Sequence, residues 1–362
     1  MNSYLKALGL AVALIAAPTA SAGEYSAMYV FGDSLSDRGN LAEAFGARWI
    51  DPPSFHYSFT DGPVAVSVLA SKLDLKADPS LWLNNFNDDA GLFPAGYAPG
   101  TNYAVADATA SAGGGIGAIN LPFQVDAYLD RSSGVADGDA LYTVFIGGND
   151  VANATRSGTG AIALTTAVSS EISSIQSLLN AGAKNIFVVN VPDVGATPAF
   201  LAGGMALSEL ATANSRTYNG LLASELGKLT GSGASIRQFD LFGYSKQIIS
   251  NASSYGITNT VGYCYDIGLP PTDPAGVKTT EACGEKAENI GQLAYWNNFH
   301  PTGKVHNLIG QGMFDVLAGS TAVPEPATWM MMIVGFGLMG LCLRRPRDGR
   351  QRLPGGLRPS LV

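Results

Sequence analysis

Short apolar runs alternate with longer stretches of helical periodicity through most of this chain. Leu141–Ile146 and Ile186–Val189 are continuous apolar runs of strand length, and between them apolar residues recur at helical spacing until Gly182. Similar runs occur at Ser26–Phe31 and Ile236–Phe239. Apolar strands separated by helices indicate a parallel sheet covered on both faces. The sequence therefore predicts an α/β domain with three layers, α/β/α, around a central parallel sheet of about five strands.

The first apolar run leads directly into a tight turn that carries a serine. Phe31 is followed by Gly32, Asp33 and Ser34, and then by a segment that can be helical. Open α/β sheets bind their ligands at the carboxyl ends of strands, so Ser34 stands where a nucleophile would be useful. The start of a helix adds backbone N–H groups that can stabilise an oxyanion. The same residues could instead simply cap a helix, which is a common role of serine and aspartate.

Four segments of the chain match the signature blocks of a known family in the family's order. Phe31–Asn40, FGDSLSDRGN, resembles the first block of the GDSL esterases and lipases, which are also called SGNH hydrolases. The later blocks are PGTNYAVADA (99–108), VFIGGNDV (144–151) and YWNNFHPT (295–302). The resemblance extends from Met28 to about Gly310. It implies a flavodoxin-like SGNH hydrolase fold and ester hydrolysis through an acyl-enzyme. No cofactor is expected, and the lack of a C-x-x-C pair or an HExxH sequence argues against a zinc site.

The resemblance also implies a role for individual residues. Ser34 is at the position of the nucleophile and His300 at that of the base. The oxyanion hole would consist of the Ser34 and Gly100 backbone N–H groups and the Asn149 side-chain amide. Glycine allows a backbone to approach a substrate closely, and an amide side chain donates a hydrogen bond without titrating.

The choice of His300 also has support from the residues themselves. Serine is a weak nucleophile at its free pKa and needs a base within hydrogen-bonding reach. The chain has three histidines, His56, His300 and His306. Pro301 directly follows His300 and suits the first position of a helix. The chain has no G-x-S-x-G sequence, which argues against the nucleophile elbow of the α/β-hydrolases.

One position departs from the family pattern. The family usually has an aspartate three residues before the histidine, and this chain has Asn297. Asparagine has no charge with which to stabilise an imidazolium, and in a serine protease the corresponding change costs about 10⁴ in kcat. Three alternatives follow: Asn297 or a backbone carbonyl orients His300 in a working dyad, another carboxylate such as Asp266 replaces the aspartate, or the site is weakened or inactive.

The two ends of the chain have the features of export signals. Residues 1–22 have one lysine, an apolar stretch and a final Ala-Ser-Ala, which is typical of a secretory signal peptide cut by signal peptidase. Residues 324–350 begin with Pro-Glu-Pro and contain an uncharged apolar run at 327–343, which is just long enough for a membrane helix. Arginines dominate the segment that follows, so 351–362 is expected to be a basic cytoplasmic tail.

The C-terminal pattern resembles a PEP-CTERM sorting signal. That resemblance implies transient membrane anchoring through 327–343, recognition by an exosortase, and export across the inner membrane of a Gram-negative bacterium that makes exopolysaccharide. A plain C-terminal membrane anchor is the alternative. In either case residues 23–323 are expected to form the hydrolase domain.

Charge and cysteine usage fit an exported protein. The whole chain has a formal net charge of −8. The two end segments contain Lys6 and six arginines against Glu325 and Asp348, so the domain itself is more acidic still, which does not suit binding to nucleic acid. Outside the C-terminal apolar run, two cysteines are present, Cys264 and Cys283. In an oxidising compartment they could pair in a disulfide, although two free thiols are the alternative.

Two classes of function remain open from the sequence. The first is a secreted serine ester hydrolase that acts on lipid or small acyl esters, with removal of acetyl groups from exopolysaccharide as a variant. The second is a non-catalytic surface or matrix protein on a retired esterase fold, an alternative suggested by Asn297 and the sorting signal.

Overall fold

A computed structural model describes residues 24–44, 55–83, 98–113, 118–229, 233–266 and 278–319. By its internal contacts the chain divides into two units, Met1–Ser320 and Thr321–Val362, and every described residue lies in the first. The expected signal peptide, the sorting segment 324–350 and the basic tail lie outside the described residues. Within the described ranges, no helix has the length and apolar character needed to cross a membrane.

Strands and helices alternate along the first part of this unit, and a second group of short strands follows. The elements are β1 (Met28–Gly32), α1 (Asn40–Ala44), α2 (Ala65–Lys72), α3 (Leu121–Arg131), β2 (Leu141–Phe145), α4 (Gly148–Ser157), α5 (Gly160–Asn180), β3 (Asn185–Val189), η2 (Val194–Ala196), α6 (Pro198–Leu201), α7 (Met205–Lys228), β4 (Ser235–Phe239), α8 (Leu241–Ser250), η4 (Ala252–Tyr255), β5 (Asn259–Asp266), β6 (Lys278–Thr279), η6 (Ile290–Gln292), β7 (Leu293–Asn297) and α9 (Gly303–Leu317).

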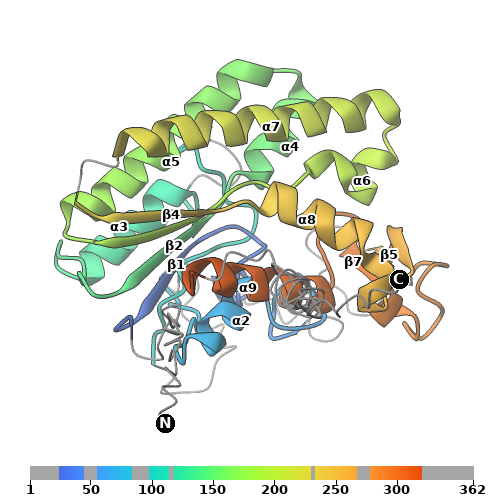
Figure 1. Ribbon diagram of the computed structural model, residues 1–362, viewed down its shortest axis with the longest axis horizontal. Helices are drawn as coiled ribbons and strands as arrows, with labels where there is room; N and C mark the ends of the chain where they lie inside the picture. The colour runs from blue at the N-terminus through green and yellow to red at the C-terminus, as the bar shows by residue number, and fades with distance from the viewer. Residues whose placement is uncertain are drawn as a thin grey trace, which may run out of the picture. The chain divides into compact units, whose positions relative to one another are not determined.

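The central sheet is parallel and has the order β1-β2-β3-β4 (Figure 1). On the free side of β1, Asn102 pairs with Val30 in an isolated parallel bridge. The Val30 N–H donates to the Thr101 carbonyl at 3.1 Å, and the Tyr103 N–H donates to the Val30 carbonyl at 2.7 Å. The sheet predicted from the sequence is confirmed, with four regular strands and this short ladder in the place of a fifth.

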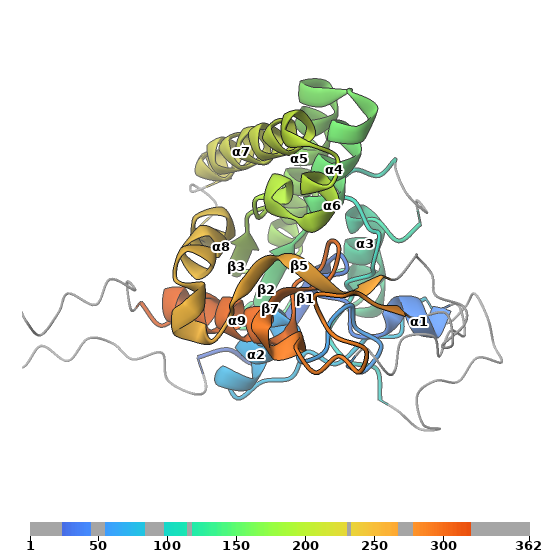
Figure 2. The same cartoon turned by 90° about the vertical axis from the view of Figure 1, so that its right-hand side faces the viewer.

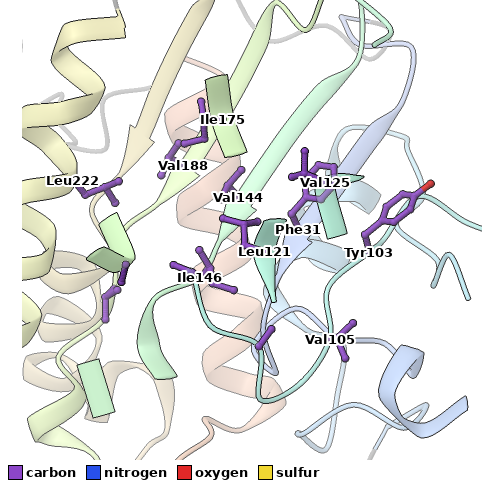
Figure 3. Packing of buried hydrophobic residues seen from close by; sticks show 14 of the residues in the cluster. Phe31, Tyr103, Val105, Leu121, Val125, Val144, Ile146, Ile175, Val188 and Leu222 are labelled. Atoms are coloured by element: carbon purple, nitrogen blue, oxygen red, sulfur yellow. The ribbon is translucent and has the colours of Figure 1, made fainter. Parts of the chain in front are cut away.

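The strands are apolar on both faces because helices cover both faces. In β2, Tyr142 and Val144 face α3, α4, α5 and α7, where they join Val125, Ile175 and Leu222 (Figure 3). Leu141 and Phe145 point the other way, into a core formed with α2, α8 and α9. Figure 1 shows α5 and α7 on one side of the sheet and α2 and α9 on the other. This is the expected three-layer arrangement.

A second, smaller sheet has the order β6-β5-β7, and it was not predicted (Figure 2). β5 runs parallel to β7, with Tyr265 opposite Asn297 in the register. A disulfide joins Cys264 in β5 to Cys283, and both residues are fully buried. The small sheet therefore places Asn297 at the end of β7, three residues before His300.

The last helix starts slightly later than the sequence predicts. Pro301 does not begin it, because Pro301 pairs with Tyr295 in an antiparallel bridge. Thr302 is the N-cap residue and α9 begins at Gly303. The segment between β7 and α9 is thus a closed turn, and His300 lies within it.

Candidate active site

Ser34 lies in the turn at the carboxyl end of β1, where the sheet predicts a ligand site. The Ser36 and Asp37 N–H groups both donate to the Asp33 carbonyl, at 3.0 and 2.9 Å, and the Leu35 N–H donates to Asp33 Oδ1 at 3.0 Å. Gly32 is required before the turn, because a Cβ there would lie 2.4 Å from the Phe145 carbonyl oxygen. Among the described residues, the Ser34 N–H has no acceptor, so it is free to bind an oxyanion.

His300 lies beside Ser34 although 266 residues separate them. Its Nε2 atom is 2.7 Å from Ser34 Oγ. The Trp296 N–H donates to the His300 carbonyl at 2.8 Å and holds the turn closed. The ring also packs against Phe59, with the two ring centroids 5.1 Å apart. Burial lowers the pKa of His300 to about 3, so the imidazole is neutral and can accept the serine proton.

Asn297 orients His300 through a single oxygen atom. Asn297 Oδ1 lies 3.1 Å from His300 Nδ1, and it also accepts hydrogen bonds from the Phe299 and His300 N–H groups at 2.9 and 2.7 Å. The two backbone donors show that the oxygen, and not the amide nitrogen, faces the ring. The neutral histidine therefore has its proton on Nδ1 and its lone pair on Nε2, which is the tautomer that a general base needs.

The other candidates for these roles lie elsewhere. Asp266 is exposed, and no hydrogen bond or ion pair of the described residues joins it to His300. His306 is buried in α9, where its Nδ1 accepts the Ala65 N–H at 3.1 Å. His56 is exposed and packs edge-on against its neighbour Phe55.

Asn149 lies at the start of α4, where the chain leaves β2. Gly147, the N-cap of that helix, has a φ of 106°, a left-handed conformation that favours glycine. A Cβ at Gly147 would also lie 2.5 Å from the Tyr218 ring, so the turn and α7 fit closely. Asn149 Nδ2 donates one hydrogen bond to the Ala108 carbonyl at 2.9 Å and has a second proton for a ligand. Asn149 and Ser34 border the same cavity.

The expectation for Gly100 is wrong. Its N–H donates to the Pro79 carbonyl at 2.9 Å and is not free for an oxyanion. A Cβ at Gly100 would lie 2.0 Å from the Asp78 carbonyl oxygen, so close backbone packing explains this glycine.

Asp107 is a second candidate for the role expected of Gly100. The Val105 N–H donates to the Gly32 carbonyl at 3.1 Å, and two residues later Asp107 lies in a turn, close enough to Asp33 for its charge to raise the pKa of that carboxyl. Asp107 has a φ of 68°, which is uncommon for a residue with a side chain. Its N–H finds no acceptor within the described ranges. The sequence alone gives little reason to single out Asp107, because aspartate tolerates a left-handed backbone better than most residues but does not require it.

Several carboxyl groups surround this part of the site, and burial makes them weak acids. Burial, together with the charges of Asp150 and Asp107, raises the pKa of Asp33 to about 7. The pKa of Asp150 is raised to about 6 by burial, against the hydrogen bonds from Ala110 and Ser111 that lower it. In the described part of the chain, no group of three or more histidine, cysteine, aspartate or glutamate side chains could hold a metal ion.

The comparisons with known proteins identify a family and a sorting motif. The family profile of the GDSL-like lipases and acylhydrolases matches residues 28–313. The chain belongs to this family. A second profile, that of the PEP-CTERM protein-sorting motif, matches residues 322–347.

Individual relatives of this GDSL-family protein are distant. Lipase 1 of Photorhabdus luminescens is 27% identical over 87% of the chain, and the chain spans 54% of that protein's length. A GDSL esterase/lipase of Arabidopsis thaliana is 26% identical over 82% of the chain and 88% of its own length. A crystal structure of an extracellular lipase from Streptomyces rimosus covers 82% of the chain and all of its own chain, with 15% identity and a TM-score of 0.34.

Proposed function

We propose that this GDSL-family protein is an exported carboxylic ester hydrolase in which Ser34 is the nucleophile and His300 the general base. The observation that carries the proposal is the 2.7 Å contact between Ser34 Oγ and His300 Nε2, with the ring already held in the basic tautomer. Serine, base and orienting group are the three parts that nucleophilic acyl transfer needs.

The reaction has two steps. Ser34 Oγ attacks the ester carbonyl carbon while its proton passes to His300 Nε2, and the imidazolium then returns that proton to the leaving alcohol. Water next attacks the acyl-Ser34 ester, with His300 again as the base, and releases the carboxylic acid and the free serine. Asn297 Oδ1 accepts the Nδ1 proton throughout, so the ring keeps its orientation.

Three donors would stabilise the oxyanion in both steps. Two of them are the Ser34 N–H and the Asn149 side-chain amide, as the sequence suggested. The third is the Asp107 N–H, which takes the place first assigned to Gly100. Preorganised donors of this kind contribute roughly 3 kcal/mol each to lowering the barrier.

Export is part of the proposal. The sorting motif at 322–347 supports recognition by an exosortase, and residues 1–22 have the pattern of a signal peptide removed by signal peptidase. In this view the hydrolase domain, 23–323, reaches the cell surface, the extracellular polysaccharide or the medium of a Gram-negative bacterium. The segment 327–343 would anchor it in the membrane only in transit.

One specific observation favours a second candidate function. An amide at position 297 gives the imidazolium no charge stabilisation, which is what a retired, non-catalytic surface protein could tolerate. The same acyl chemistry on a different ester would give the other variant, removal of acetyl groups from exopolysaccharide.

Covalent labelling of Ser34 tests the proposal. A fluorophosphonate probe should modify Ser34 in the purified domain, and Ser34→Ala should remove both the label and hydrolysis of p-nitrophenyl acetate. Ser253→Ala, a change at an exposed serine in η4, is the matched control and should leave both intact. An unlabelled wild-type Ser34 in a folded domain would favour the retired site. Acetate release from purified exopolysaccharide without cleavage of acyl lipids would identify the deacetylase.

A further inference from the structure

A cavity of about 300 Å³ adjoins the reactive serine. Ser34 and Asn149 border it at one end. It passes between the carboxyl end of the central sheet, α8 and α9, and Lys246 on α8 lies at its wall with its side chain half exposed.

The wall of this cavity is mostly apolar. Phe145 contributes from the end of β2, Leu241, Ile248 and Ile249 from α8, and Val305 and Ile309 from α9. Four of the five aliphatic side chains are buried in the core on that face of the sheet, and Ile249 is partly buried against it. A wall of this kind favours a hydrocarbon group over a sugar or a charged group, because a polar ligand would lose its hydrogen bonds to water.

The position of the cavity distinguishes the two halves of an ester. The alcohol must leave beside His300 Nε2, since this nitrogen returns the proton to it. His300 contacts Ser34 but does not itself line the cavity, which its neighbours Phe299 and Pro301 border. The cavity instead adjoins Asn149, on the side of the expected oxyanion donors. The group that enters it is therefore the acyl chain.

We infer that this cavity is a binding site for an unbranched medium-chain acyl group and that α8 sets its length. The inference rests on the proposed function, and it adds the substrate class. A volume of about 300 Å³ has room for about ten groups of the size of a water molecule, whose share of liquid volume is about 30 Å³. A methylene is of similar size, so an acyl chain of about eight to ten carbons fills the cavity.

Hydrolysis rates on a series of p-nitrophenyl esters, from acetyl to palmitoyl, test the inference. Each buried methylene should raise kcat/KM by about fourfold until the cavity is full, and the gain should stop near ten carbons. Ile249→Trp should lower the ratio of decanoyl to acetyl kcat/KM by about 15- to 60-fold, which corresponds to two or three methylenes. Ile162→Trp is the matched control, since Ile162 is 82% exposed on α5 and should leave the ratio unchanged.

Two further measurements keep the inference falsifiable. If Ile249→Trp does not fold, Ile249→Ala should shift the preferred chain length upward by one or two carbons. Binding of decanoate, measured by calorimetry, should weaken in Ile249→Trp and not in Ile162→Trp, and this readout does not depend on hydrolysis.

The outcomes separate the inference from the proposed function. A wild-type protein that cleaves acetyl and decanoyl esters equally well would overturn the acyl cavity and leave the esterase intact. A protein that binds decanoate but cleaves no ester would support the acyl cavity and overturn the proposed function. An Ile249→Trp variant with an unchanged chain-length ratio would also overturn the role of α8.

Discussion

His300 Nδ1 lies 3.1 Å from Asn297 Oδ1, so an uncharged amide orients the candidate base. The same oxygen accepts two backbone N–H groups, which hold it in place while the ring turns or titrates. Orientation and charge stabilisation are separate contributions of the aspartate in a Ser-His-Asp triad. In this site Asn297 orients the His300 ring but does not stabilise the charge of the imidazolium.

Replacing the amide by a carboxylate should restore the missing contribution. We expect Asn297→Asp to raise kcat by about tenfold, because one unit of histidine pKa corresponds to about 1.4 kcal/mol of imidazolium stabilisation. Asn297→Ala should lower kcat by about 10² or more, since His300 Nδ1 loses the side-chain oxygen that accepts its proton. The measurement is kcat/KM against pH on one short-chain ester. Asp266→Asn should leave kcat/KM unchanged. A loss of activity in this variant would mean that the Asp266 carboxylate already stabilises His300.

The acid limit of activity should lie well below the ordinary pKa of histidine. A general base must be unprotonated, so activity is lost as the pH falls through its pKa. Burial lowers the pKa of His300 to about 3, so wild-type kcat/KM should hold from pH 7 down to about pH 5. In Asn297→Asp the pH below which activity is lost should be higher than in the wild type. Circular dichroism at each pH separates titration from acid unfolding, and a wild-type limb at pH 6.5 would contradict the assignment.

The charge of Asp107, which acts on Asp33 next to Ser34, should limit the rate. Asp107→Gly keeps the proposed N–H donor and removes a carboxylate near the oxyanion, so kcat should rise by about fivefold, the effect of roughly 1 kcal/mol of charge repulsion. Asp74→Gly is the matched control, because Asp74 also has a positive φ, 58°, and is exposed after α2. The free energy of unfolding of both variants should lie within about 1 kcal/mol of the wild-type value. Equal kcat in the two variants would remove Asp107 from the site.

The buried carboxyl of Glu171 should make the protein less stable as the pH rises. Burial raises the pKa of Glu171 from 4.5 to about 8, while the Tyr218 hydroxyl, 2.5 Å from Oε2, lowers it in part. The folded state thus holds a proton that the unfolded state has released, and the free energy of unfolding falls from pH 4.5 to pH 8 by as much as about 5 kcal/mol. Glu171→Gln should make this decline shallower in denaturant titrations at pH 5, 7 and 9, and the part that remains comes from Asp33 and Asp150. A parallel decline in both proteins would contradict it.

The central sheet was predictable because its strands are buried on both faces. A mostly apolar run as short as Leu141–Ile146 is typical of a buried strand, and β2 ends within one residue of that run. The residues after the strands, Ser34 and Asn149, were located with them. The small sheet was missed because β5 has no such run: most of its residues are only half buried, and its pairing depends on a segment about 30 residues further along.

The error at Gly100 has a physical cause as well. A glycine can be required by packing as much as by a ligand, and the sequence does not distinguish the two. At Gly100 a side chain would collide with the Asp78 carbonyl. This contact joins two loop segments, and no local sequence pattern predicts it. Asp107 was missed for the complementary reason, since its left-handed backbone belongs to the turn that follows the ladder beside β1 and its side chain does not require it.

The separation of 266 residues between Ser34 and His300 gives the chain an order of assembly. A chain that crosses a membrane from its N-terminus delivers the nucleophile early and the base almost last. Until α9 and the turn before it arrive, Ser34 has no proton acceptor and is an ordinary alcohol. The site therefore becomes reactive only when the C-terminal part of the domain has folded against its N-terminal part.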